Sequence, residues 1–367
     1  MTAVFRTRGH AAAAVVERAV RSERPPHALL LVGPARVGKT TLALDLACGL
    51  LCLRPEPSER PCRECSACRK VDHGNHPDLH RLAPEGAGQQ IRLGQVQALT
   101  AELALMPAEG RFRLAIIEQA HRLNQDAQNA LLKTLEEPHP KVVLILAADE
   151  SASLLPTVVS RCARLRLGPV AAEVITDMLA EAEVADASRG ARLARLAGGC
   201  PGRALAIAAQ PEVLVAQDRL ARRLLALLGG DRRERLAALD ELLEDAAGLV
   251  LTDEAAETPA ERPARRSRAA SSRAAPAERR LAAAQLLSIW RDVTRDLALA
   301  AHGAVSELRL RELADDMLDA GSTVSGPALA QFLARLDDAG RAVDAYANPE
   351  LVLDVLLLKW PRSGRAA

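Results

Sequence analysis

Short apolar runs alternate with amphipathic stretches through the first half of the 367-residue chain. The apolar runs have the length of buried strands and are Ala28–Val32, Asp78–Leu82, Phe112–Ile117 and Lys141–Leu146. The stretches with apolar residues at helical spacing are Thr40–Leu53, Gln95–Leu105 and Gln125–Leu135. Because strand and helix patterns alternate along the chain, we predict an α/β domain with a parallel sheet over residues 1–168.

The strand pattern stops near Val170, and helical patterns follow it. A small group of helices reaches to about Ala208. The longer predicted helices are Leu214–Leu228, Arg232–Ala246, Arg279–Ala300, Pro327–Tyr346 and Leu351–Trp360. We therefore predict a small helical domain at 169–208 and an all-α domain at 209–367.

Residues 252–276 differ in composition from the helices around them. They consist almost wholly of Ala, Glu, Arg, Pro, Ser and Thr, with prolines at positions 259, 263 and 276. Such a segment cannot bury enough apolar surface to become ordered, so we predict a disordered insertion within 209–367. Its arginines suit either a DNA contact or a solvated linker, and we favour the linker.

Composition narrows the classes of function. Lys and Arg number 48 against 47 Asp and Glu, a net charge of +1, so any contact with DNA must be local. Aromatic residues make up 2% of the chain, which argues against a platform for stacking unpaired bases. The sequence has neither a secretion signal nor an apolar stretch of about 20 residues, and we expect a cytoplasmic protein without a membrane segment.

Residues 33–40 match the phosphate-binding pattern G-x-x-x-x-G-K-[ST]. The match follows a predicted strand and opens a predicted helix, as the motif requires. Glycines let backbone N–H groups close around phosphate, while the lysine reaches the β- and γ-phosphates and the hydroxyl holds Mg²⁺. We predict a nucleotide site formed by Gly33, Gly38, Lys39, Thr40 and Thr41.

Hydrolysis of a bound nucleotide needs acidic groups at the end of a neighbouring strand. The apolar run 114–117 ends in Glu118 and Gln119. Glu118 is a candidate metal ligand, but the amide of Gln119 cannot accept a proton as a glutamate would. We predict that ATP is bound with little or no hydrolysis. The alternative is that both side chains only hydrogen-bond to neighbouring loops.

Four of the seven cysteines lie close together at the spacing C-x9-C-x2-C-x2-C. They are Cys52, Cys62, Cys65 and Cys68, and four thiolates suit the tetrahedral coordination of a structural Zn²⁺. This set defines a predicted zinc module at 52–68. Buried cysteines without a metal and an iron–sulfur cluster are the alternatives.

Arg161 stands in the tripeptide Ser-Arg-Cys, after an amphipathic run and before the strand-like run Ala163–Leu167. In a P-loop domain, a guanidinium held at this place can reach the phosphates of a nucleotide on a neighbouring subunit. A surface arginine in an ion pair is the alternative, and the tripeptide alone does not exclude it.

Taken together, these motifs resemble those of the bacterial clamp-loader AAA+ subunits over about residues 10–208. The matching segments are 33–41, the four cysteines, 75–79, 91–93, 110–112, 116–123, 129–138, 155–162 and 201–205. The run Asn129–Pro138 (NALLKTLEEP) is highly specific to this group. The segment Asn348–Leu351 with the Leu-rich helix after it looks like the family's collar domain.

Two kinds of clamp-loader subunit share these motifs: a motor (gamma/tau) that hydrolyses ATP and a stator that does not. Glu118-Gln119 stands where the motor carries Asp-Glu, and Ala147-Ala148 stands where the motor carries a sensor threonine. Both replacements favour the stator. The intact P-loop departs from those stator subunits whose loop has decayed, and leaves the motor as the alternative.

The resemblance implies that Arg161 acts in trans as an arginine finger on the ATP of an adjacent motor subunit. It further implies that 169–208 is an AAA+ lid and that 209–367 is the collar of a hetero-pentamer with gamma/tau and delta subunits. That assembly places the sliding clamp on primer-template DNA as part of the DNA polymerase III complex. Two rivals from other classes are a zinc-ribbon DNA-binding module and a small-molecule kinase.

Overall fold

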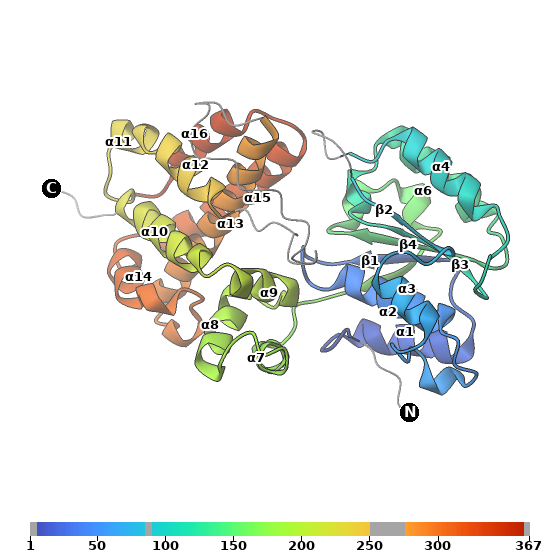
Figure 1. The fold of residues 1–367 in the computed structure, drawn as a ribbon. Helices are drawn as coiled ribbons and strands as arrows, with labels where there is room; N and C mark the ends of the chain where they lie inside the picture. Colours follow the sequence, from blue (N-terminus) through green and yellow to red (C-terminus); the bar gives the residue numbers. More distant parts are fainter. Residues whose placement is uncertain (1–5, 85–89, 250–275, 363–367) are drawn as a thin grey trace, which may run out of the picture. The chain divides into compact units, whose positions relative to one another are not determined.

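The computed structural model describes residues 6–84, 90–249 and 276–362 (Figure 1). The chain divides into two compact units, Met1–Ala204 and Leu205–Ala367. The predicted disordered insertion at 252–276 lies outside the described residues except for Pro276, which begins α13 (Pro276–Ala301). The three-domain division at 168 and 208 remains a prediction.

The first unit is built on a five-stranded parallel sheet with the order β2-β3-β4-β1-β5. The strands are β1 (Ala28–Val32), β2 (Leu79–Leu82), β3 (Arg113–Ile117), β4 (Val142–Ala148) and β5 (Ala163–Arg166). Every residue of β3 and β4 is buried, as expected of central strands that helices cover on both faces. The predicted parallel α/β fold is therefore confirmed.

Helices cover both faces of this sheet (Figure 1). They are α1 (Ala11–Ser22), α2 (Lys39–Leu51), α3 (Ser66–Asp72), α4 (Leu93–Leu103), α5 (Gln125–Glu136) and α6 (Pro156–Val159). After β5 the chain continues into α7 (Ala172–Glu181), α8 (Ala187–Ala197) and α9 (Pro201–Ala209).

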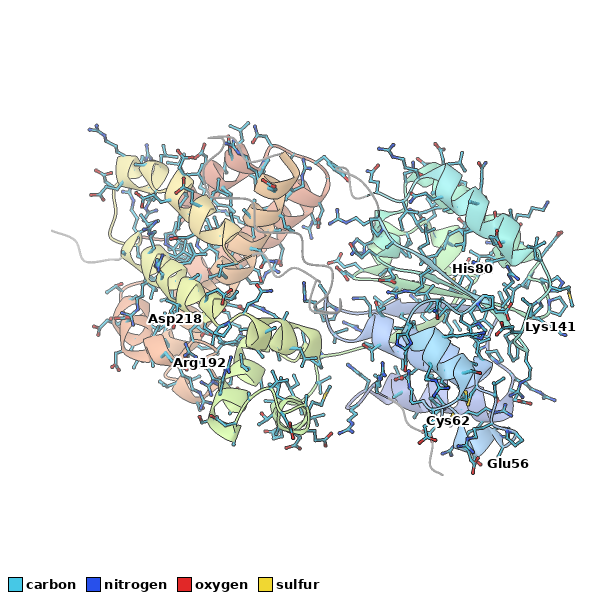
Figure 2. The ribbon with its side chains drawn as sticks, viewed as in Figure 1. Glu56, Cys62, His80, Lys141, Arg192 and Asp218 are labelled. Atoms are coloured by element: carbon cyan, nitrogen blue, oxygen red, sulfur yellow. The ribbon has the colours of Figure 1, made fainter. Side chains whose placement is uncertain are left out.

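Alternate residues of each central strand enter different cores. Leu29 of β1 packs with α1, α2 and α3, whereas Leu30 packs with α4 and α5. Cys62 belongs to the first core, and His80 lies on the edge strand β2 (Figure 2). The period of two along the strands thus builds a three-layer domain.

Strand order determines which loops meet. Parallel strands end at the same edge of the sheet, and β1 lies beside β4, which lies beside β3. The P-loop after β1 therefore shares an edge with Asp149 after β4 and Glu118 after β3.

The described part of the second unit is helical. Its α-helices are α10 (Glu212–Ala226), α11 (Arg232–Ala237), α12 (Leu239–Ala247), α13, α14 (Ala314–Gly321), α15 (Gly326–Asp344) and α16 (Pro349–Lys359). Trp290, Phe332 and Trp360 form its aromatic core, with ring centroids 4.6 to 5.4 Å apart. Among the described residues, no helix is long and apolar enough to cross a membrane.

Two helices replace the single helix predicted at 232–246. Arg235 of α11 is buried, and its guanidinium donates to carbonyl groups at the end of α16, including those of Leu357 and Trp360. Leu242 of α12 is buried in a helix that packs on α13. The helix is interrupted at Ala238; α11 packs mainly against α16, and α12 packs mainly against α13.

Candidate nucleotide and metal sites

The P-loop adopts a conformation that only its glycines permit. Gly38 caps α2 with φ of +111°, in the left-handed region that favours glycine. A Cβ on Gly33 would lie 2.3 Å from the carbonyl oxygen of Leu167, so no side chain fits there. Helix α2 begins at Lys39, and Thr40 and Thr41 lie in its first turn. The predicted nucleotide residues of the loop are thus brought together, with a helix N-terminus suited to phosphate.

The side chain of Lys39 is nearly buried, and three oxygens surround its ammonium group. Lys39 Nζ lies 2.6 Å from the Gly33 carbonyl oxygen, 2.8 Å from that of Pro34 and 2.8 Å from Oδ1 of Asp149. His121 adjoins the same aspartate, because the Asp149 amide lies 3.3 Å from His121 Nδ1. Asp149 was not predicted from the sequence, where its only signal is an acidic residue directly after the apolar run of β4.

Glu118 is paired with a cation from the neighbouring strand. Its Oε1 lies 2.8 Å from Nε and 2.6 Å from NH2 of Arg81 on β2. Gln119 follows with φ of +50°, which turns the chain away from the sheet. Arg81 was not predicted from the sequence, because the pairing of β2 with β3 is a feature of the sheet order.

Two further segments contact the P-loop. His10 Nε2 lies 3.0 Å from the Val37 carbonyl oxygen, and the Gly202 amide donates to the Arg36 carbonyl at 3.0 Å. A Cβ on Gly202 would lie 2.9 Å from that oxygen, so glycine permits the approach of α9. The N-terminal segment and α9 thus both contact the P-loop.

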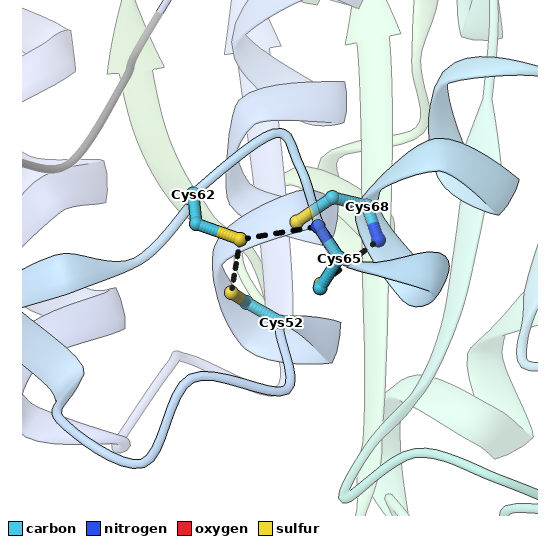
Figure 3. A group of neighbouring side chains, drawn as sticks. All are labelled: Cys52, Cys62, Cys65 and Cys68. Carbon is cyan, nitrogen blue, oxygen red and sulfur yellow. Dashed lines mark hydrogen bonds between the residues drawn. The ribbon is translucent and has the colours of Figure 1, made fainter. Parts of the chain in front are cut away.

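The four predicted metal ligands come together (Figure 3). The sulfur atoms of Cys52, Cys62, Cys65 and Cys68 all lie within 4.8 Å of one another, and the first two are 3.6 Å apart. Zn–S bonds of about 2.3 Å in a tetrahedron place sulfur atoms about 3.8 Å apart. Cys65 caps α3 and accepts the Cys68 amide at 3.4 Å. This cluster can hold a metal ion.

The thiols of the cluster influence one another's ionisation. The Cys68 thiol and burial raise the pKa of Cys52 to about 12, and the pKa of Cys68 is also raised, chiefly by its hydrogen bond with Cys48. Burial opposes ionisation of Cys62, but the backbone amides of Glu64 and Cys65 lower its pKa. A bound cation would supply the charge that stabilises four thiolates together, and its binding would release protons.

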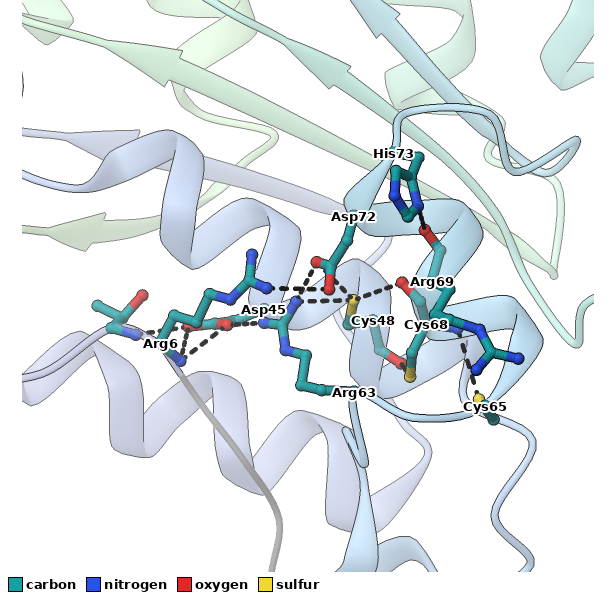
Figure 4. Close-up of polar contacts among 10 residues, drawn as sticks. Arg6, Asp45, Cys48, Arg63, Cys65, Cys68, Arg69, Asp72 and His73 are labelled. Carbon is teal, nitrogen blue, oxygen red and sulfur yellow. Dashed lines mark hydrogen bonds and ion pairs between the residues drawn. The ribbon is translucent and has the colours of Figure 1, made fainter. Parts of the chain in front are cut away.

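A buried ion-pair network ties the cysteine cluster to the P-loop helix (Figure 4). Asp45 of α2 is fully buried and accepts the amides of Arg6 and Thr7 at 3.1 and 2.8 Å. It also pairs with Arg63, which lies between two of the cysteines and donates to Asp72 at 2.6 Å. These long-range contacts have no signature in local sequence spacing.

Arg161 lies at the amino-terminal end of the parallel strands, whereas the P-loop lies at their carboxyl-terminal end. It precedes β5, which is parallel to β1, whereas the P-loop follows β1. Arg161 NH2 lies 2.6 Å from Oε1 of Glu136, and its NH1 donates to the Thr157 carbonyl at 2.9 Å. The guanidinium is therefore turned away from this chain's own phosphate loop and is held in a surface ion pair.

The fold and this site define a P-loop protein of the AAA+ class. Residues 9–171 match the family model described as "DNA polymerase III, delta subunit". Over this region the chain is similar to the clamp-loader subunits of DNA polymerase III, which confirms the resemblance found in the motifs.

Relatives named delta′ match better than the motor subunits. DNA polymerase III subunit delta′ of Bacillus subtilis is 37% identical over 45% of this chain and 49% of its own length. The delta′ subunit of Pseudomonas aeruginosa is 40% identical over 48% of this chain and 53% of its own length. Gamma and tau subunits match at 33 to 35% identity.

The family model matches residues of the first unit. The chain spans about half the length of the curated relatives it matches. Among solved structures, a gamma subunit-related protein of DNA polymerase III from Thermotoga maritima aligns with 96% of this chain and 99% of its own. Its sequence identity is 17% and its TM-score 0.43.

Proposed function

We propose that this chain is a delta′-type stator of a clamp loader, which binds a nucleotide without hydrolysing it and supplies a cation to a neighbouring ATPase. The observation that carries the proposal lies at the end of β3. There Glu118 is paired with Arg81, and Gln119 stands at the position that would activate water. A complete phosphate loop is thus combined with an incomplete hydrolytic site.

ATP with Mg²⁺ fits the P-loop residues. Gly33 and Gly38 give the backbone its phosphate-binding shape, Lys39 supplies the positive charge, and Thr40 and Thr41 present hydroxyls at the start of α2. Mg²⁺ would neutralise charge between the phosphates, with Glu118 as its candidate carboxylate. Because Gln119 cannot take a proton from water, the chain binds the nucleotide and hydrolyses it slowly or not at all.

Zn²⁺ is the metal that the four cysteines suit best. Four thiolates leave no open coordination position, so the ion is structural. It stabilises the loop from Cys52 to Cys68 against α2, the helix that starts in the P-loop.

Arg161 is the proposed catalytic residue in trans. In an assembly with gamma/tau and delta subunits it would leave Glu136 and stabilise charge on the phosphoryl group transferred at a neighbouring site. Arginine fingers contribute about 10³ to 10⁵ in rate. Residues 209–367 would form the collar of the pentamer, which loads the sliding clamp onto primer-template DNA in the cytoplasm during replication by DNA polymerase III.

ATPase assays of the isolated chain and of the reconstituted complex test the proposal. We expect negligible turnover by the isolated chain and strong turnover by the complex. Arg161→Ala should leave assembly intact and lower the complex's rate by at least 100-fold, because the trans cation is lost. Arg164→Ala, a neighbouring exposed arginine on β5, is the matched control. An unchanged rate with Arg161→Ala would remove the finger role.

The intact P-loop favours a second candidate, the gamma/tau-type motor itself. A motor hydrolyses ATP at its own loop, so Lys39→Ala would then abolish turnover measured with the isolated wild-type chain. Robust hydrolysis of this kind would replace the stator proposal by the motor.

A further inference from the structure

The two charged groups expected to meet the outer phosphates and the metal each have a countercharge from this chain. Lys39 Nζ lies 2.8 Å from Asp149 Oδ1, and Glu118 Oε1 lies 2.6 Å from Arg81 NH2. Asp149 follows β4 and Arg81 lies on β2, the two strands on either side of β3. The sheet order therefore supplies both countercharges.

The ammonium group of Lys39 has no spare hydrogen-bond donor. It carries three protons, and its three acceptors are the carbonyls of Gly33 and Pro34 and the carboxylate of Asp149. Of these three acceptors, the carboxylate alone is charged. A phosphate oxygen that binds Lys39 must displace one of them and then lies beside the negative charge of Asp149.

The resulting repulsion depends on how far the ligand's phosphate chain extends. A P-loop lysine reaches the β- and γ-phosphates, so a triphosphate places a further charged group next to the carboxylate, whereas a diphosphate ends one group earlier. Mg²⁺ held by Glu118 would compensate, but the carboxylate is paired with Arg81 and becomes a metal ligand only after that pair separates. The Asp149 side chain is 39% exposed, so solvent screens the repulsion and leaves it moderate.

We propose that Asp149 is the specificity-determining residue of the P-loop and that it makes the site select nucleoside diphosphates over nucleoside triphosphates. The inference rests on the proposed function in one respect, namely that the loop binds nucleotide. It is independent of Arg161 and of assembly with other subunits.

The test is a competition assay with the full-length isolated chain, in which ADP or ATP with Mg²⁺ displaces a fluorescent ADP analogue at fixed ionic strength. The wild-type chain should bind ADP at least tenfold more tightly than ATP. Asp149→Asn should tighten ATP binding at least tenfold and ADP binding no more than threefold. Asp149→Ser is a second variant that also removes the charge, and thermal melts establish that both are folded.

Glu150→Gln is the matched control, because it removes the same charge from the adjacent, exposed residue. It should leave the ADP-to-ATP ratio within twofold of the wild-type ratio. Equal affinities of the wild-type chain for ADP and ATP, or equal gains for both in Asp149→Asn, would overturn the proposal. So would the absence of nucleotide binding by the wild-type chain and both Asp149 variants. Since Arg161 is tested by turnover of the complex, the two proposals can fail separately.

Discussion

Replacing Asp45 by asparagine removes the carboxylate that joins the N-terminal segment, the P-loop helix and the cysteine loop. The Asp45 side chain is fully buried, and the side chain of its partner Arg63 is 10% exposed. Removing one member of a buried ion pair costs about 3–5 kcal/mol because the other charge stays buried. Arg63 keeps Asp72 as a partner, so we expect a loss near the lower limit, about 3 kcal/mol.

The chain carries separate reporters for its two units. All seven cysteines lie within Met1–Ala204, and both tryptophans, Trp290 and Trp360, lie within Leu205–Ala367. Thiol accessibility during heating therefore reports on the first unit, and tryptophan fluorescence reports on the second. For a domain of this size each kcal/mol shifts the midpoint by about 2–4 °C, so Asp45→Asn should lower the thiol midpoint by about 6–12 °C.

Asp45→Asn should leave the fluorescence midpoint in place, which provides an internal control. The double variant Asp45→Asn with Arg63→Met should be less destabilised than the sum of the single variants, because the second change removes the unpaired cation. A thiol midpoint within 1 °C of the wild-type value, or strictly additive effects, would refute the account of a buried pair.

Three further predictions follow from other groups. Arg235→Met removes a buried guanidinium that binds carbonyls of α16, and should destabilise the second unit by about 2–4 kcal/mol, seen in fluorescence and not in thiol exposure. Burial opposes ionisation of Asp78, but hydrogen bonds from three backbone amides outweigh burial and lower the pKa of this carboxyl below 3.8. The Asp78 carboxylate therefore stabilises the fold above pH 3.8, and this contribution is lost as the pH falls further. Asp78→Asn should therefore show a flatter dependence of the circular-dichroism midpoint on acid, and an equal slope would contradict this. Elemental analysis should find one zinc per chain, and chelation should lower the thiol midpoint alone; a chain without metal would mean free thiols.

Local residue spacing was sufficient to predict the structural features whose residues lie close together along the chain. The P-loop predicts its own strand, turn and helix, and the cysteine spacing predicts a cluster within one loop, because few residues separate the groups. The strands of the sheet were also predictable, since β1 and β4 are short apolar runs bounded by polar residues.

Long-range pairs could not be predicted in this way. Asp149 is 110 residues from Lys39, and Arg81 is 37 residues from Glu118; only the strand order brings them together. The division of 232–246 into two helices likewise depends on Arg235 meeting α16, which is 122 or more residues away in the chain. Helical periodicity carries no information about such partners.

The close approach of Gly33 to the Leu167 carbonyl oxygen has a mechanical consequence. Leu167 donates its amide to Val32, so the backbone of β1 and the stretch leading out of β5 are fastened at one point. The chain continues from there into α7 and α8. A ligand that changes the conformation of the phosphate loop would therefore act on the start of α7 through Leu167, in addition to the direct contact between Gly202 and Arg36.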